Sequence, residues 1–317
     1  MPKLSVISSF LGSISDKYLQ YQEERKLKQK LKMASEIKNI EGVELCYPAD
    51  FDNLDQLKEF LNIYNLQVSA VNFRSRRDNK WMRGSFSSEK SSEREEVITD
   101  MKKAIDYALE LGCERITTCP LNEGHDYPFE MDYDRGLDYF AESIYEIASY
   151  NSEVNICLEY KKNGPRTRSL LANGGETLFF CNQVGRENVG VTMDIGHAIL
   201  ADERPAQTAV MLDKANKLFY IHLNDNDRAW DWDMIPGSVN IFEFVEFFYY
   251  LDRLDYNDWF AYDVFPKEID TLETFNTVTA ITLKLMKIAN NLNEKKINNL
   301  FAQRNPAAAM KYLYSRL

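Results

Sequence analysis

Short apolar runs alternate with amphipathic stretches along most of the chain. Eight runs are rich in apolar and β-branched residues, and most lack the strict apolar–polar alternation of a half-exposed strand. They span residues 3–9, 42–48, 66–73, 113–120, 154–161, 189–196, 218–225 and 259–266. Nearly continuous apolar runs of this length are typical of strands that are covered on both faces. The pattern therefore predicts a buried, mainly parallel sheet.

The segments between these runs have helical periodicity. Residues 93–112 carry acidic side chains early and end at a glycine after the last apolar turn, and residues 134–151 and 240–256 follow the same pattern. Strand–helix alternation repeated eight times favours a single (β/α)8 TIM barrel of the α/β class over a doubly wound open sheet. No Gly-x-Gly-x-x-Gly follows the first run, which removes support from a dinucleotide-binding version of the open sheet.

The chain lacks a linker or a low-complexity stretch that would divide it. We expect residues 1–270 to form the barrel and residues 271–317 to form the last barrel helix and a C-terminal helical extension. A long helical pattern covers residues 272–296, and the tail after it contains the segment "NPAAAMKYLYSRL" at 305–317. This tail exceeds what barrel closure requires, so we expect it to pack on a neighbouring surface, such as another subunit.

Composition narrows the class of protein. The chain has 317 residues, of which 44% are hydrophobic and 27% charged, as in a globular protein. The net charge of -11 opposes nucleic-acid binding and favours a small neutral or cationic partner. The five cysteines form no Cys-x-x-Cys pair, which is typical of buried thiols in a reducing compartment. Without a long apolar run or a signal-peptide pattern, we expect a cytoplasmic protein that does not contact membranes.

Ionisable side chains stand at the ends of the last four runs. The fifth run carries Glu159, the sixth Asp194, the seventh His222 and the eighth Asp263. In a (β/α)8 barrel these ends meet at one rim, where such groups would repel one another or shift their pKa values unless a cation neutralised them. They predict a divalent metal site, although each residue alone also suits a core ion pair or a helix cap. The oxygen majority favours Mn²⁺, with Co²⁺, Mg²⁺ or Zn²⁺ as alternatives.

A second acidic pair follows the seventh run. Asp231 and Asp233 lie two residues apart between tryptophans, and His197 follows Asp194 by three residues. These three side chains, together with Asp194 as a shared ligand, would hold a second ion near the first. The alternative is a solvated acidic loop.

This succession of residues resembles the xylose isomerase-like TIM barrel superfamily of sugar isomerases and epimerases. Within it, the motifs are most similar to the bacterial L-rhamnose isomerase type. "LEYK" at 158–161 resembles its metal-binding Glu and substrate-contacting Lys, "NEGHDYPFE" at 122–130 its loop after strand four, and "WMRGSFSSEKSSER" at 81–94 its segment before helix three. The likeness covers about residues 40 to 266 and also implies a homo-oligomer, either a dimer or a tetramer.

The resemblance implies a metal-dependent isomerase that interconverts an aldose and a ketose by hydrogen transfer between C1 and C2. Glu159, Asp194, His222 and Asp263 would hold a structural ion, and His197, Asp231 and Asp233 a second ion that activates water. Glu159, Lys161 and Asp231 would act in catalysis, with Lys161 stabilising negative charge on the sugar oxygen. The candidate sugar contacts are Phe73, Trp81, His125, Tyr127, Arg228 and Trp230.

Two other functions remain open. A single-metal ketose 3-epimerase would carry a glutamate where this chain has Asp263 and another glutamate within the segment "KKNGPR" at 161–166, although Arg228 matches an arginine of that group. A barrel that binds sugar or metal without turnover would lose part of the second ligand set. Related nucleases need earlier histidines, and none precedes His125. Arg74, Arg76 and Arg77 suit either a substrate phosphate or a solvated loop.

Overall fold

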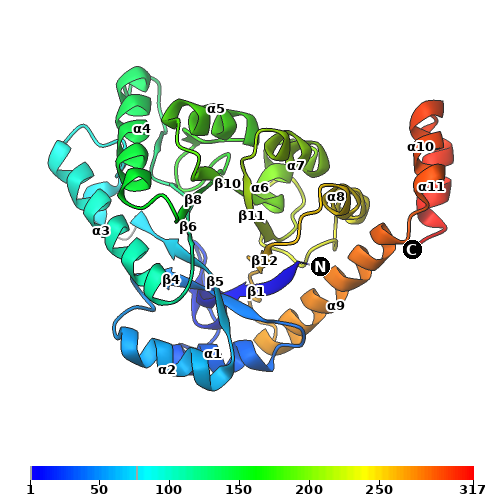
Figure 1. Cartoon of the computed structure of the whole chain (residues 1–317), viewed down its shortest axis with the longest axis horizontal. Coiled ribbons are helices and arrows are strands. Elements are labelled where there is room, and N and C mark those ends of the chain that lie inside the picture. The colour runs from blue at the N-terminus through cyan, green and yellow to red at the C-terminus, as the bar shows by residue number, and fades with distance from the viewer. Residues whose placement is uncertain (1, 76–77) are drawn as a thin grey trace.

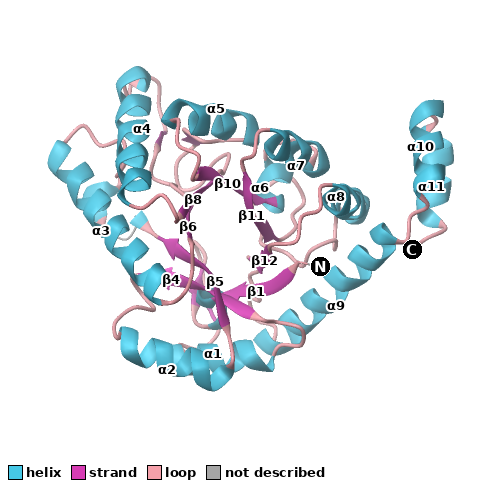
Figure 2. Ribbon diagram, in the orientation of Figure 1, coloured by secondary structure: helices cyan, strands magenta, loops and turns pink. Residues whose placement is uncertain are grey.

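The eight predicted strands form one closed barrel. The structure is a computed structural model that describes residues 2–75 and 78–317. All neighbouring strands of the barrel are parallel and close in the order β1-β12-β11-β10-β8-β6-β5-β4 (Figure 2). The strands are β1 Lys3–Ile7, β4 Gly42–Tyr47, β5 Gln67–Phe73, β6 Arg115–Thr118, β8 Asn155–Glu159, β10 Val189–Asp194, β11 Leu218–Leu223 and β12 Trp259–Tyr262. The predicted (β/α)8 fold is confirmed.

Both faces of these strands are buried, which explains their nearly continuous apolar sequence. Residues two apart on a strand share a face. On β4, Val43 and Leu45 belong to the large core cluster between the barrel and its helices, whereas Cys46 belongs to a smaller cluster with Ala70, Cys157 and other residues. The smaller cluster fills the barrel interior, so the side chains in register with it also point inward.

Helices cover the outside of the barrel (Figure 1). Asp132 caps the start of α4 through the backbone N–H of Arg135, and Gly185 ends α5 with a φ of 70° that suits glycine. The surrounding helices are α1 Leu27–Glu36, α2 Leu54–Tyr64, α3 Ser91–Glu110, α4 Tyr133–Tyr150, α5 Gly174–Val184, α6 Ile195–Leu200, α7 Pro205–Lys214, α8 Ile241–Arg253 and α9 Thr271–Asn290. No helix within the described ranges is long and apolar enough to span a bilayer.

The helical pattern predicted over residues 272–296 is divided between two helices. α9 ends at Asn290, and α10 (Glu294–Gln303) begins after Asn293, whose side chain accepts a hydrogen bond from the N–H of Lys296. At the start of a helix the first backbone N–H groups lack a partner within the helix, and the side chain of Asn293 supplies one for Lys296. This cap favours a break between the two helices. α11 (Pro306–Tyr314) follows, and both helices come after the end of α9 (Figure 1). They contact α8, where Arg253 pairs with Glu294 at 3.1 Å and the ring of Phe242 packs on Tyr314 at 4.8 Å.

Short elements shape the mouth of the barrel at the C-terminal ends of its strands. The 3₁₀ helix η1 (Ser8–Leu11) follows β1, and the hairpin of β2 (Ile14–Ser15) and β3 (Gln20–Tyr21) comes after it. The 3₁₀ helix η3 (Asn79–Trp81) lies between β5 and α3. β7 (Gly124–His125) pairs with β9 (Arg168–Ser169), which ties the loop after β6 to the loop after β8. These loops therefore form one connected rim.

Candidate metal centre

Four of the predicted ligands meet inside the barrel mouth. Glu159 is in phase with inward-facing Cys157, and His222 with inward-facing Tyr220. One ligand atom from each of the four residues lies within 4.8 Å of the others. The group consists of Glu159, Asp194, His222 and Asp263. Four consecutive strands of the barrel, or the residue directly after one of them, thus supply the group.

The imidazole of His222 is held in one orientation. Its Nε2 lies 2.9 Å from a carboxylate oxygen of Glu44, and both side chains are fully buried. Nδ1 makes no hydrogen bond and faces the group, at 3.5 Å from Glu159 and 3.8 Å from Asp263. Burial raises the pKa of Glu44, but His222, Asn72 and Thr117 together hold it below the ordinary value, so the carboxylate is ionised and accepts from Nε2–H. Nδ1 therefore faces the three carboxylates. The charges of Glu44 and Glu159 raise the pKa of His222 against the effect of burial, so a cation bound at Nδ1 would replace a proton there.

A second set of contacts orients Asp194. One oxygen accepts from the backbone N–H of His197 at 2.8 Å, and the other accepts from the side-chain amide of Asn224 at 2.6 Å. Asn224 packs directly on Gly196, where a Cβ would lie 1.7 Å from its Oδ1. The sequence needs glycine here because this polar network lies against the start of α6.

The crowding of acids changes their proton affinities. Burial raises the pKa of Asp194 to about 6, with a further contribution from Glu159. Burial and the charge of Asp194 raise the pKa of Asp263 to about 7. Burial also acts on Glu159, but His222 and His197 hold its pKa below the ordinary value. These opposed shifts are the physical signature of like charges that share a small buried volume.

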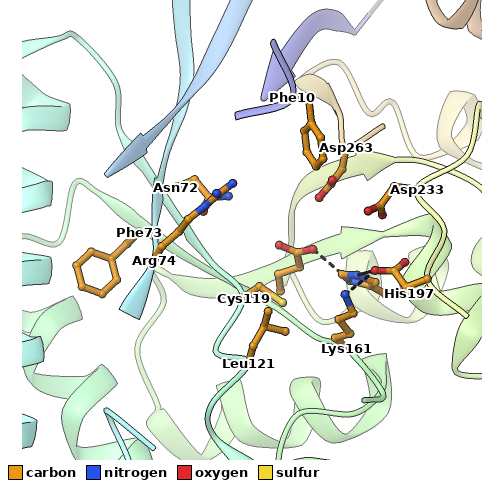
Figure 3. Close-up of a pocket in the computed structure, with 12 residues that line it drawn as sticks. Phe10, Asn72, Phe73, Arg74, Cys119, Leu121, Lys161, His197, Asp233 and Asp263 are labelled. Atoms are coloured by element: carbon orange, nitrogen blue, oxygen red, sulfur yellow. Dashed lines mark hydrogen bonds and ion pairs between the residues drawn. The ribbon is translucent and has the colours of Figure 1, made fainter. Parts of the chain in front are cut away.

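A chain of polar contacts runs beside this group. Nε2 of His197 lies 3.3 Å from Oδ2 of Asp231, and Nζ of Lys161 donates to the same oxygen at 2.5 Å (Figure 3). Nδ1 of His197 lies 3.1 Å from Oε1 of Glu159. Asp231 and Asp233 raise the pKa of Lys161 against the effect of burial, so the amine stays protonated. Asp231 is therefore neutralised by an ammonium group in this arrangement.

The structure does not group His197, Asp231 and Asp233 as the second ligand set expected from the sequence. Within the described part of the chain, the donors that come within mutual reach of a cation are the four-residue group and a set of Cys119, Glu159 and His197. Burial and the charges of Asp231 and Asp263 raise the pKa of Asp233 well above its ordinary value. In this arrangement Asp231 pairs with Lys161, and the second ion stays a prediction.

A pocket opens over these residues. It has a volume of about 110 Å³ and includes Phe10, Arg74, Cys119 and Leu121 beside the acidic cluster. Arg74 follows β5, and its guanidinium donates to Oγ of Ser9 at 2.8 Å, whereas Arg76 and Arg77 lie outside the described residues. The full lining is Phe10, Asn72, Phe73, Arg74, Cys119, Leu121, Glu159, Lys161, His197, Asp231, Asp233 and Asp263.

Most of the sugar contacts expected from the sequence lie away from this pocket. Phe73 lines it, but its ring points away from the acidic cluster and stacks on Tyr47 (Figure 3). Trp81 is only 1% exposed, and its indole N–H donates to the carbonyl of Glu93. The described lining residues do not include Trp81, His125, Tyr127, Arg228 or Trp230.

The other expected contacts belong to the rim loops. Tyr127 is 74% and Trp230 48% exposed. The ring of His125 packs on Tyr133 at 4.9 Å, and Arg228 pairs with Glu243 at the start of α8. Neither the residue type nor the likeness of a loop motif tells which way a loop side chain turns.

The sequence analysis missed three residues that build the site. Glu44 is the partner of His222, and Asn224 is the partner of Asp194. Phe10 forms a wall of the pocket. An acidic residue within the apolar run 42–48 is a usable signal, because a buried charge requires a partner. The other two give no comparable signal.

The donor set fits a divalent cation. Three carboxylates and one imidazole suit ions that prefer oxygen and nitrogen ligands. The buried Nδ1 of His222 lacks a hydrogen bond while its Nε2 is anchored, which is how a protein prepares a histidine ligand. A cation at this position would also relieve the repulsion that raises the pKa values of Asp194 and Asp263.

The fold and the cluster define a (β/α)8 barrel with a polar centre at its C-terminal mouth. The chain belongs to the xylose isomerase-like TIM barrel family, whose model matches residues 31–291, and this confirms the resemblance seen in the sequence.

Known proteins match the chain at low identity. A xylose isomerase from Thermus thermophilus is 26% identical over 59% of this chain and 50% of its own length. An L-ribulose 3-epimerase from Methylomonas sp. is 23% identical over 56% of this chain and 59% of its own length. The matches thus span about half of these curated relatives.

Solved structures share the fold over nearly the whole chain. A xylose isomerase domain protein from Alicyclobacillus acidocaldarius has a TM-score of 0.71 at 17% identity, covering 92% of this chain and 100% of that one. A D-tagatose 3-epimerase-like protein has a TM-score of 0.69 at 20% identity, covering 90% and 98%. At these identities the likeness concerns the fold alone.

Proposed function

We propose that the protein is a divalent-metal-dependent sugar isomerase that interconverts an aldose and a ketose. The observation that carries the proposal is the anchored His222, whose Nδ1 faces three carboxylates beside the chain of Lys161, Asp231 and His197. The named relatives are a xylose isomerase and a 3-epimerase, which supports sugar isomerisation or epimerisation as the class of reaction.

Glu159, Asp194, His222 and Asp263 would hold the ion. We propose Mn²⁺ as its identity because oxygen donors predominate, with Co²⁺, Mg²⁺ or Zn²⁺ as substitutes. When bound, such an ion would supply Lewis-acid polarisation of the substrate carbonyl.

The remaining steps fall to side chains of the pocket. The ammonium of Lys161 stabilises the negative charge that develops on the oxygen at C1 or C2. Asp231 lies between Lys161 and His197, where it can accept the proton from one of these two oxygens and return it to the other. A hydrogen moves from C2 to C1 in the same turnover, so aldose and ketose remain isomers.

A single-metal ketose 3-epimerase is the second candidate. Structures of 3-epimerases share the fold, and one curated relative is an L-ribulose 3-epimerase. Asp263 stands at the end of the eighth strand, and Arg228 turns to Glu243 instead of lining the pocket. A 3-epimerase would carry a glutamate at the position of Asp263 and would direct the arginine to its substrate, so both features favour the isomerase. A barrel that binds sugar or metal without turnover is the third candidate.

A single experiment separates these candidates. The protein is stripped with a chelator, Mn²⁺ is added back, and a panel of aldoses and ketoses is followed by NMR. A 1,2-isomer supports the proposal, whereas a 3-epimer overturns it in favour of the second candidate. Binding without conversion of any sugar overturns both. Asp263→Asn, which keeps the size of a ligand side chain, is expected to remove turnover, and Asp202→Asn, at an exposed turn position just after α6, is the matched control.

We further propose that the protein works in the cytoplasm as a homo-oligomer. The support for the cytoplasm is the set of five free cysteines. The support for a homo-oligomer is the helical tail of α10 and α11, which leaves the apolar side chains Phe301, Met310 and Tyr314 exposed.

A further inference from the structure

An apolar groove lies between the barrel helices and the helical tail, residues 291–317, which contains α10 and α11. The groove has a volume of about 830 Å³. Val245 and Tyr249 of α8 line it from the barrel, and Phe301, Met310 and Leu313 line it from the tail. Phe301 is 50% and Met310 41% exposed. Contiguous exposed apolar surface of this kind marks an interaction site.

α11 has less packing than a short helix needs. None of its nine residues is buried. Isolated helices of fewer than about 12–15 residues are marginal in water, because tertiary packing supplies most of the stability of a helix in a protein. The hydroxyl of Tyr312 accepts from the N–H of Asn293, and the ring of Tyr314 packs on Phe242. The side of α11 that borders the groove therefore has room for a further packing partner.

The charge of the helical tail is opposite to that of the barrel. Residues 291–317 carry five basic side chains and one acidic side chain, whereas residues 1–290 carry 33 basic and 48 acidic side chains. Opposite charges on two surfaces steer their association and select the partner. A second copy of the chain brings an acidic barrel to the basic tail, so the charge pattern favours self-association.

Two charged residues of the groove have no ion pair in the described part of the chain. Arg304 directly follows α10, and Glu246 lies on α8. Glu243, one turn earlier on α8, already pairs with Arg204 at 2.7 Å. Loss of hydration raises the pKa of Glu246, and the charge of Arg204 offsets only part of this rise. A cation supplied by a partner would stabilise the Glu246 carboxylate.

We propose that this groove is the interface of a twofold-symmetric dimer, in which Arg304 pairs with Glu246 of the partner subunit. A twofold axis brings the basic side of one groove opposite the acidic side of the other, so a surface that carries both charges is complementary to itself. Phe301 and Met310 would be covered in the same interface. A flat anionic bilayer fits less well, because the groove is concave and Glu246 would be repelled. The proposal names the surface of the homo-oligomer proposed above and rests on that proposal.

The test is the mass of the full chain in solution, measured by analytical ultracentrifugation over a range of protein concentrations. We expect the mass of two chains and a Kd that rises with salt, because salt screens ion pairs. Phe301→Ser and Arg304→Glu should each weaken the dimer by about tenfold or more.

A charge swap makes the test specific. Glu246→Arg alone should weaken the dimer, and the combination of Arg304→Glu with Glu246→Arg should restore it, because the pair is re-formed with exchanged signs. Lys295→Glu, exposed on α10 outside the groove lining, and Phe179→Ser, 67% exposed on α5, are the controls that should leave the mass unchanged. Circular dichroism checks that each variant is folded.

Three outcomes would overturn the proposal. They are a monomer at every concentration, a dimer that Phe301→Ser and Arg304→Glu leave intact, and a charge swap that does not restore association. The second outcome would keep the homo-oligomer and place its interface elsewhere. A monomer that binds phosphatidylglycerol vesicles through its tail would assign the groove to a membrane instead. The measurement needs neither metal nor sugar, so its failure is separable from failure of the isomerase proposal.

Discussion

Glu44 accepts a hydrogen bond from Nε2 of His222 at 2.9 Å, deep inside the barrel. Its other oxygen accepts from the amide of Asn72 and the hydroxyl of Thr117, each at 2.7 Å. All three partners donate a hydrogen bond to Glu44, so each of its oxygens must act as an acceptor. Glu44 therefore acts as a positioning residue that keeps a proton on Nε2 of His222 and leaves Nδ1 as the atom available to a metal ion.

Replacing Glu44 by Gln should weaken metal binding. An amide must turn its NH₂ group toward His222 or toward Asn72 and Thr117, and either choice sets donor against donor. We expect about a 10- to 100-fold loss of metal affinity, measured by competition with a coloured chelator. Glu41→Gln, at an exposed position just before the same strand, is the control. An affinity within twofold of the unmodified protein would show that Glu44 does not orient the ligand.

Gly196→Ala should disturb Asp194 through Asn224. The new Cβ would lie 1.7 Å from Oδ1 of Asn224, whose amide donates to Asp194 at 2.6 Å. Overpacking of this kind costs about 1–3 kcal/mol of stability, measured by denaturant unfolding. Adding Asn224→Ala should relieve the clash and restore part of this stability, but metal affinity should stay low because Asp194 has lost its partner. Recovery of both properties in the double variant would contradict the proposed role of Asn224.

The sequence allowed the barrel and the four-residue centre to be predicted, because both follow from strong local patterns. Buried strands produce apolar runs, and Glu159, Asp194, His222 and Asp263 stand at the ends of four of them. The inward direction of these side chains depends on strand phase, which two-residue periodicity fixes once the strand ends are known.

Features that depend on three-dimensional packing escaped prediction. Trp81 was expected at the sugar but is buried near Glu93, because loop side chains follow the packing of the loop and not the strand register. Asn224 resembles any other strand-end amide until α6 is placed against it. The ion pair of Asp231 with Lys161 likewise has no local signal, because the two residues lie 70 positions apart in the chain.

Asp231→Asn should remove isomerisation while the four-residue centre keeps its ion. The substitution deletes the carboxylate that joins Lys161 to His197, and loss of positioned proton transfer costs about 10²- to 10⁴-fold in rate. The check pairs kcat with the metal content of the purified variant, and Asp202→Asn serves as a surface control with an exposed side chain. Turnover near that of the unmodified protein would exclude Asp231 from the reaction.

Removing the metal should lower thermal stability. An ion that binds only the folded chain adds about 2.7 kcal/mol when its concentration is 100 times Kd. We expect chelator to lower Tm and added Mn²⁺ to restore it, as followed by circular dichroism. Asp263→Asn should abolish this response, because it removes one donor from the four-residue group. An equal Mn²⁺ response in Asp263→Asn would show that the ion binds elsewhere.

Phe10 provides an apolar wall of the pocket that no sequence motif indicated. It lies in η1, directly after β1, and is close to Asp263 in the view of the pocket (Figure 3). Partial burial of a phenylalanine against a bound sugar is worth about 1.4 kcal/mol, which corresponds to about tenfold in affinity.

Phe10→Ala should therefore raise KM about tenfold for the sugar that is turned over, with a smaller change in kcat, because the ring contacts substrate and transition state alike. Tyr127→Ala should leave KM unchanged, since Tyr127 is 74% exposed on a rim loop outside the pocket lining. Steady-state kinetics on both variants show whether Phe10 or Tyr127 contacts the sugar. If Tyr127→Ala raises KM and Phe10→Ala does not, the loop after β6 closes over the sugar, and the contact expected from the sequence at Tyr127 is the correct one.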